Sequence, residues 1–407
     1  MGERRGGVTG VGVISALGLT AGAFWEALSQ GRPGIGPIEG VDCSPLRFHN
    51  GAEAHGYNAE AYFDPKEAGF MDRFAQFALI AAREAVADAG VDWTPALRER
   101  AAIVTGSCVG GQSTQDQGFV DIYLERRPRV HPLTIPKTMA NAGASFISME
   151  FGLQGPTFTI STACSSSNHA IGHAFWMVRQ GIADLAITGG SEAPFSMGLL
   201  RAWEALRVIS PDTCRPFAKD RRGMILGEGG AMLVIEALEE AQARGARIYA
   251  EIVGFGMSSD ARHITQPSAE GPARAMRAAL ADSRMPVEAI GYVNAHGTGT
   301  PANDPVETRA LRAVLGAQAD RVAISSTKSM HGHALGAAGG IEAVAATLAL
   351  HHGILPPTAN FTEADPECDL DVIPNTARRA EVDGVLSNSF AFGGLNAVLA
   401  FRRWNGA

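Results

Sequence analysis

Short apolar runs alternate with helical patterns along the whole chain. The segments 101–111 and 184–193 each begin with an apolar run and continue into a glycine-rich turn. The stretch 73–89 instead spaces its apolar residues close to a 3.6-residue period, which predicts a helix. This alternation predicts an α/β protein whose strands are buried on both faces.

The two halves of the chain repeat one another. The segment VTGVGVIS at 8–15 is similar to IVGFGMSS at 252–259, and both are short apolar strands that end in serine. In the same order, 101–111 matches 291–300 and 184–193 matches 384–394. We expect two halves of one architecture, spanning 1–244 and 245–407.

Composition narrows the classes of function. The chain has 407 residues, 46% of them hydrophobic, and a formal net charge of -8, so it offers no basic surface for nucleic acid or an anionic membrane. The apolar stretch near the N-terminus is broken by glycines and has no convincing cleavage site, so we expect it to be part of the mature protein. The longest apolar stretch of the chain is bracketed by Glu342 on one side and by His351 and His352 on the other. It is too short to span a membrane, so we expect no membrane span and a cytoplasmic enzyme.

Neither disulfides nor metals are predicted. The five cysteines are widely spaced and contain no C-x-x-C pair. His169 and His173 have a spacing that suits zinc, but no third ligand accompanies them. Nucleotide-binding fingerprints are absent, so we expect neither a bound metal nor a nucleotide cofactor.

Cys164 lies between a β-rich segment at 157–161 and a predicted helix from about 165 to 180. A helix start favours the thiolate, because unpaired N–H groups and the positive end of the dipole lie there. The position therefore suits a nucleophile. A buried cysteine in a serine-rich cap is the alternative, and the local pattern alone leaves both open.

Two further segments concentrate histidine and glycine after apolar strands. They are NAHGTGTPANDPVE at 294–307 and STKSMHGHALGAAGG at 326–340. Taken singly, His296 and His333 could each be a hydrogen-bonded histidine at a turn, and Lys328 could be a surface residue.

Together these motifs resemble the β-ketoacyl synthases of fatty-acid and polyketide synthesis, over nearly the whole chain. The matching segments are TACSSS, NAHGTGTP, TKSMHGHALGAAG and NSFAFGGLN. The resemblance implies a thiolase-like fold with two pseudo-symmetric α-β-α-β-α halves in five layers. It also implies decarboxylative condensation of an acyl thioester with malonyl-carrier protein, without a cofactor.

The resemblance also implies the role of each site residue. Cys164 would carry the acyl chain, while His296 and His333 would donate hydrogen bonds to the malonyl thioester. The backbone N–H groups of Cys164 and Phe392 would form the oxyanion hole. Further roles are implied for Lys328, Glu342 and Glu307, which would support the histidines, and for Thr298 and Thr300, which would bind the phosphopantetheine arm.

The sequence departs from the family's usual pattern at the implied acyl pocket and at the implied docking site. Pocket positions are Val109, Leu133, Thr134, Leu200 and Phe392; the small side chains at 133 and 134 suggest medium-to-long or unsaturated chains. The usual basic docking pair for the acidic acyl carrier protein is missing, which leaves Lys66 and Arg73 as candidates. We expect a homodimer or a heterodimer with a ketosynthase-like partner.

Two rival functions share this fold. A non-catalytic chain-length partner subunit would keep the fold but generally lacks the nucleophile, whereas Cys164 is present here. A thiolase or starter-type synthase differs at the second catalytic position, where starter-type enzymes use His and Asn. The two histidines, His296 and His333, favour an elongating synthase.

Overall fold

The computed structural model describes residues 3–406, which form one ten-stranded mixed sheet with helices on its faces. The strand order is β10-β9-β13-β14-β8-β1-β7-β6-β4-β5. The N-terminal strands are β1 (Gly6–Ser15), β4 (Ala101–Gly106), β5 (Thr157–Ile160), β6 (Leu185–Glu192) and β7 (Gly229–Ala237). The C-terminal strands are β8 (Ala250–Ser259), β9 (Ile290–Asn294), β10 (Ala323–Ser325), β13 (Gly384–Ala391) and β14 (Leu395–Arg403).

The sheet is symmetric about the junction of β1 and β8. These strands pair over only three residues each, Gly6–Val8 with 250–252. Outward from that junction, β7, β6, β4 and β5 have β14, β13, β9 and β10 as counterparts. The three predicted sequence repeats are the equivalent strand pairs β1 and β8, β4 and β9, and β6 and β13.

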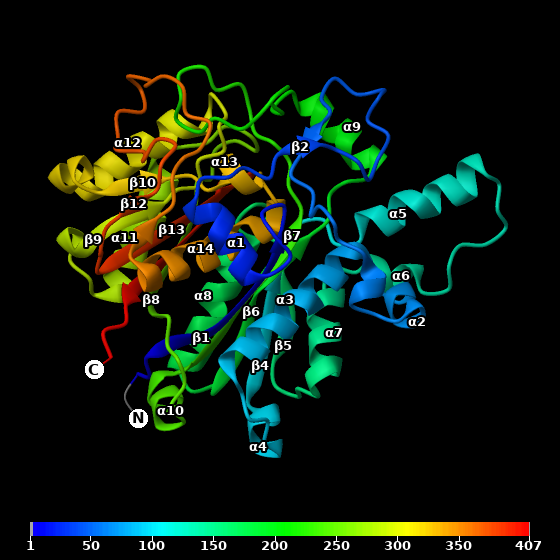
Figure 1. The fold of residues 1–407 in the computed structure, drawn as a ribbon, viewed down its shortest axis with the longest axis horizontal. Coiled ribbons are helices and arrows are strands. Elements are labelled where there is room, and N and C mark those ends of the chain that lie inside the picture. Colours follow the sequence, from blue (N-terminus) through cyan, green and yellow to red (C-terminus); the bar gives the residue numbers. More distant parts are fainter. Residues whose placement is uncertain (1–2, 407) are drawn as a thin grey trace.

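Helices divide the molecule into five layers (Figure 1). Helix α3 (Arg73–Ala89), as predicted from its periodicity, covers the N-terminal strands together with α7 (Ala142–Phe151). Helix α11 (Glu270–Ser283) covers the C-terminal strands and packs on α12 (Asn303–Leu315). Between the two halves of the sheet lie α8 (Ser166–Arg179) and α14 (Ala338–His352), which contact strands of both halves.

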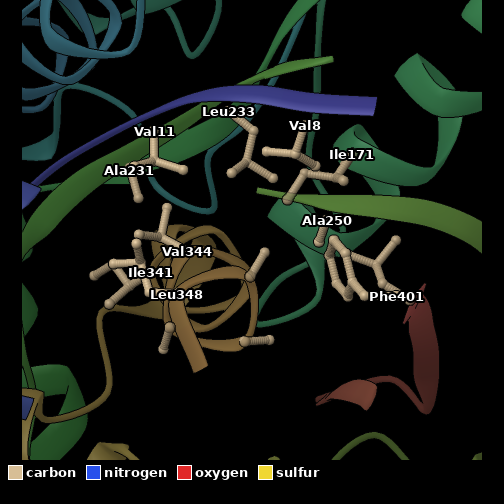
Figure 2. Close-up of a cluster of buried hydrophobic side chains, with 14 of the residues drawn as sticks. Val8, Val11, Ile171, Ala231, Leu233, Ala250, Ile341, Val344, Leu348 and Phe401 are labelled. Carbon is tan, nitrogen blue, oxygen red and sulfur yellow. The ribbon is translucent and has the colours of Figure 1, made fainter. Parts of the chain in front are cut away.

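The central layer is the main hydrophobic core. Every residue of α14 from Ala338 to Leu350 is buried. The helix carries apolar residues on all sides, and it packs between the two halves of the sheet. Figure 2 shows Ile341, Val344 and Leu348 of this helix facing Val11 of β1 and other apolar side chains. The core therefore holds the central helices rigidly between the two halves. Among residues 3–406, no helix is long and apolar enough to cross a membrane.

The remaining elements are short and lie mainly over the ends of the sheet. The helices are α1 (Ala21–Ser29), α2 (Pro65–Gly69), α4 (Pro95–Glu99), α5 (Gln112–Phe119), α6 (Thr134–Thr138), α9 (Met197–Leu206), α10 (Leu238–Ala243) and α13 (Lys328–His331). Single turns of other helix types are η1 (Ala59–Ala61), η2 (Val120–Leu124), η3 (Val287–Ala289), η4 (Gly316–Asp320) and η5 (Leu335–Ala337). Two small ladders join β2 (Gly36–Pro37) to β3 (Asn50–Gly51), and β11 (Ile354–Leu355) to β12 (Arg378–Arg379).

Close packing of α8 on β4 depends on Gly106. A Cβ at this position would lie 2.5 Å from the backbone of Ser166 and Ser167. We predict that Gly106→Ala lowers the free energy of unfolding by about 1–3 kcal/mol, because it overpacks the helix against the strand. Denaturant unfolding measures this. Gly22→Ala on α1 is the matched control, because a Cβ there meets no atom within 4 Å; an equal loss in both variants would contradict the prediction.

Candidate active site

Cys164 is presented by a tight turn between β5 and α8. Ala163 has a φ of +51°, a left-handed conformation that is uncommon for a residue other than glycine and often marks a functional turn. Serine side chains hold the turn closed, because Ser165 Oγ donates to the Thr162 carbonyl at 2.9 Å and Ser166 Oγ to the Ala163 carbonyl at 2.7 Å. The predicted strand, turn and helix are confirmed.

The next two residues attach the start of α8 to the other half of the chain. Ser167 Oγ donates to the Gly336 carbonyl, just before α14. Asn168 Nδ2 donates to the carbonyl of Ser387 on β13 at 3.0 Å. The serine-rich segment is therefore a set of anchors between the two halves as well as a helix start.

The three predicted side chains Cys164, His296 and His333 line one cavity of about 110 Å³. His296 follows β9, and His333 lies between α13 and η5. The two imidazole rings are 5.5 Å apart between centroids and nearly perpendicular, at 87°. A single bound thioester can therefore reach the thiol and both rings.

Hydrogen bonds fix which imidazole nitrogen carries the proton. The backbone N–H of Leu335 donates to His333 Nδ1 at 3.1 Å, so the proton of that ring lies on Nε2. Lys328 Nζ lies 3.4 Å from His296 Nδ1, and an ammonium group only donates. Both neutral rings consequently keep an Nε2–H donor free of these contacts.

Lys328 supports the site from beneath the cavity. Its ammonium group is fully buried, pairs with Glu342 and donates to the His296 carbonyl at 2.7 Å. Glu307 accepts hydrogen bonds from the backbone N–H groups of His296 and Gly297, both at 2.8 Å. The two carboxylates thus hold the lysine and the loop that carries His296.

Burial controls the charge of the site. Desolvation, followed by the repulsion of Lys328, lowers the pKa of His296 and of His333 well below the usual value, so both are neutral at pH 7. Desolvation also raises the pKa of Cys164 to about 11, although Lys328 and the backbone N–H groups of Phe392 and Cys164 oppose the rise. The N–H groups at the helix start thus favour the thiolate, as expected, but the effect of burial on the pKa is larger.

The other predicted residues fall into three groups: those that line the cavity, those in an apolar cluster next to it, and those outside it. Thr298 and Thr300 line the cavity, with their hydroxyl oxygens 2.9 Å apart, and Phe392 lies beside them. Val109, Leu200 and Phe392 belong to one apolar cluster next to the cavity. Leu133 and Thr134, at the start of α6, do not line the cavity of their own chain.

Two features of the site were not predicted. Trp203 on α9 lines the cavity and stacks on Phe392, with ring centroids 6.2 Å apart. The loop 260–267 forms another wall, and its Ile264 carbonyl accepts a hydrogen bond from the Gly393 N–H at 2.7 Å. Neither carries a motif, because an apolar helix face and an irregular loop acquire this role only through tertiary contact.

Two predictions outside the cavity have different outcomes. Arg73, suggested as a contact for a carrier protein, forms an ion pair with the buried Glu228 at 2.6 Å and lies over the ring of Tyr57, so its charge is already paired within the chain. Lys66 is exposed. Within residues 3–406, no group of three or more potential ligands is placed to hold a metal ion.

A thiol and two neutral imidazoles around one cavity, with a buried lysine behind them, are typical of an acyltransferase that forms an acyl-enzyme. The chain belongs to the β-ketoacyl synthase family: the model of its N-terminal domain matches residues 5–241 and that of its C-terminal domain matches 249–362. The fold is accordingly the thiolase-like one.

Individual relatives match along nearly their whole length. The chain is 46% identical over 401 residues to nodulation protein E of Rhizobium sp. strain N33, covering 98% of this chain and 100% of that protein. It is 41% identical over 409 residues to 3-oxoacyl-[acyl-carrier-protein] synthase 2 of Staphylococcus aureus strain COL, covering 99% of each. The solved ishigamide ketosynthase/chain length factor superposes with a TM-score of 0.95 at 37% identity, covering 99% of this chain and 100% of that one.

Burial of histidines near Lys328 makes stability depend on pH. Burial lowers the pKa of His331 to about 3, whereas in the unfolded chain it is near 6.5. Its neutral form is thus favoured on folding, and the stability present above pH 6.5 is lost as the pH falls toward 3. We predict that His331→Gln flattens the decline of the unfolding free energy between pH 6 and 4 by about 1.4 kcal/mol per pH unit.

Denaturant titrations at several pH values measure this slope. The control is His55→Gln, because His55 is solvent-exposed in the folded protein. The slope for His331→Gln should differ from that of the wild type, while the slope for His55→Gln should not. Identical slopes for all three proteins would disprove the prediction.

Proposed function

We propose that this chain is an elongating β-ketoacyl-[acyl-carrier-protein] synthase, which condenses an acyl group on Cys164 with malonyl-carrier protein. The observation that carries the proposal is the shared cavity, in which the thiol of Cys164 faces two neutral imidazoles with Nε2–H donors. No cofactor is needed, because the thioesters themselves supply the activation.

In the first half-reaction, the thiol of Cys164 takes the acyl group from one carrier thioester, and the carrier leaves as a free thiol. In the second, malonyl-carrier protein loses carbon dioxide, and the resulting enolate oxygen is held by His296 and His333. The enolate carbon attacks the acyl carbonyl on Cys164. The tetrahedral oxyanion, held by the N–H groups of Cys164 and Phe392, then expels the cysteine thiolate, which takes up one proton.

The neutral state of both imidazoles suits this chemistry. A neutral N–H donor strengthens its hydrogen bond as negative charge develops on the enolate oxygen, and each such donor typically contributes about 3 kcal/mol to the transition state. The neighbouring cation Lys328 keeps protons off both rings. It also favours the thiolate form of Cys164, the form that leaves when the product is released.

The intact site favours a catalytic subunit over a chain-length partner. A partner that only shaped the pocket would not require Cys164 at a strained turn, nor Lys328 and Glu342 as a pair fully buried beneath the histidines. An unneeded buried ion pair costs desolvation energy. These features support the synthase function.

The cavity mouth offers a docking surface for an acidic carrier protein, which we term the arginine rim: Arg207 and Arg262 with Leu206 and Ile264. Both arginine side chains are exposed, and neither forms a hydrogen bond or an ion pair among residues 3–406. Each adjoins a residue of the cavity wall, Val208 and His263. The apolar Leu206 and Ile264 are exposed beside them. A phosphopantetheine arm entering there would pass Thr298 and Thr300.

A second ketosynthase-type chain fits the opposite edge of the N-terminal half. Strand β5 is a sheet edge with Phe158 exposed. In the same half of the chain α5 projects from the body (Figure 1) and continues into η2, where Tyr123 and Leu124 are 63% and 76% exposed. An open edge with large apolar side chains is a site for pairing with another chain. Leu133 and Thr134 lie in the segment that follows this arm, so they would line a partner's pocket and not their own.

Removing one donor should separate the two half-reactions. We predict that His333→Ala slows carbon dioxide release from malonyl-carrier protein by about 10²–10³-fold, because one hydrogen bond to the enolate is lost. Cys164→Ala should abolish acyl transfer but leave carbon dioxide release, because both imidazoles remain. Radiolabelled malonyl-carrier protein reports both. His352→Ala, at the exposed end of α14, is the control. Carbon dioxide release at the wild-type rate by His333→Ala would contradict the mechanism.

Charge reversal tests the arginine rim. We predict that Arg207→Glu with Arg262→Glu raises the KM for acyl-carrier protein by roughly tenfold or more, because like charges then face each other across the interface. The KM for a pantetheine thioester without the carrier should not change. Arg379→Glu is the control, because the Arg379 side chain is also exposed and has no hydrogen bond or ion pair in the described part of the chain. Equal effects on both substrates would show that the rim does not bind the carrier.

A further inference from the structure

Glu192 is a buried carboxylate that none of the preceding steps uses. It is the last residue of β6 and is fully inaccessible to solvent. Its Oε1 accepts from Ser107 Oγ at 3.0 Å and from the Val109 N–H at 3.2 Å. Its Oε2 accepts from the Cys108 N–H at 2.6 Å and from the Gly336 N–H at 3.0 Å. Each carboxylate oxygen thus accepts two hydrogen bonds.

These donors come from two separate walls of the site. Cys108 and Val109 follow β4 and belong to the apolar cluster that adjoins Phe392. Gly336 lies three residues after His333, in the turn whose Leu335 N–H fixes the proton of that imidazole. One carboxylate therefore joins the wall of the acyl pocket to the turn that orients a catalytic histidine.

The C-terminal half contains the same device. Glu307 accepts from the N–H groups of His296 and Gly297, which follow β9, the counterpart of β4. Glu192 accepts from Cys108 and Val109 at the equivalent place after β4. In each half, a buried carboxylate holds the loop that follows the equivalent strand, β4 or β9. Of the two carboxylates, Glu192 also holds a loop of the other half, at Gly336.

We propose that Glu192 is a positioning residue of the condensation reaction, which holds the acyl-pocket wall at Val109 in fixed relation to His333. The proposal rests on the proposed function. Exchange for glutamine places an amide NH₂ against N–H donors, and only Ser107 can turn its hydroxyl to accept from it. If the amide NH₂ takes the place of Oε1, where it can donate to Ser107, the backbone N–H of Val109 loses its acceptor. The opposite orientation leaves the N–H groups of Cys108 and Gly336 without one.

Two variants separate the reach of the side chain from its charge. Glu192→Asp keeps the charge but is one methylene too short to hold both loops. Glu192→Gln keeps the length but removes a negative charge that raises the pKa of Cys164. Both should slow carbon dioxide release from malonyl-carrier protein by on the order of tenfold. Only Glu192→Gln should shift the pH profile of Cys164 alkylation by iodoacetamide, toward lower pH.

The experiment measures both quantities on the full chain, with the alkylated Cys164 peptide followed by mass spectrometry. Glu84→Gln is the matched control, a carboxylate of α3 that accepts from the N–H groups of Val13 and Ala21 far from the cavity. Wild-type release rates in both variants would overturn the proposal, as would an alkylation profile shifted equally by all three exchanges. If Glu192→Gln does not fold, the release rate of Glu192→Asp decides.

Failure of the proposed function gives a different result. If the wild-type chain released no carbon dioxide from malonyl-carrier protein, the condensation reaction would be wrong, and the positioning role with it. The alkylation profiles would then still show whether Glu192 acts on Cys164 through its charge.

Discussion

The buried ammonium group of Lys328 is the interaction on which the site depends. Its side chain is completely enclosed, and its donors meet the carbonyl and Nδ1 of His296 and the carboxylate of Glu342. The same charge helps to keep the imidazoles of His296 and His333 neutral and opposes the rise in the pKa of Cys164. Removing either member of the Lys328–Glu342 pair would leave an uncompensated charge in the core, which is strongly destabilising.

Burial sets the resting state of this site as a neutral one. Desolvation disfavours the charged form of the thiol and of both imidazoles. The positive charge of Lys328 opposes this effect at the thiol and reinforces it at the imidazoles. In the proposed condensation, negative charge develops only during the reaction, and the N–H donors that would bind it are already in place. Such preorganised donors are effective because they do not have to reorient at the moment of reaction.

The duplicated architecture places equivalent positions in different chemical roles. Cys164 follows β5 and Lys328 follows its counterpart β10, while Val109 follows β4 and His296 follows its counterpart β9. The central helices α8 and α14 bring these strand ends together, because both are packed between the two halves. One half thus presents the thiol of Cys164, and the other presents the two imidazoles and Lys328.

Local pattern was sufficient for the elements and for the motifs. The helix at 73–89, the turn around Cys164 and the paired repeats are all observed, because periodicity and small-residue turns depend on near neighbours. The pKa of Cys164 and the ion pair of Arg73 were not predictable, because desolvation and pairing come from distant parts of the chain. Arg73 and its partner Glu228 are 155 residues apart. By itself, the sequence determined which residues stand at strand ends; the tertiary structure decided which are buried, paired or neutral, since those properties depend on what the fold packs around them.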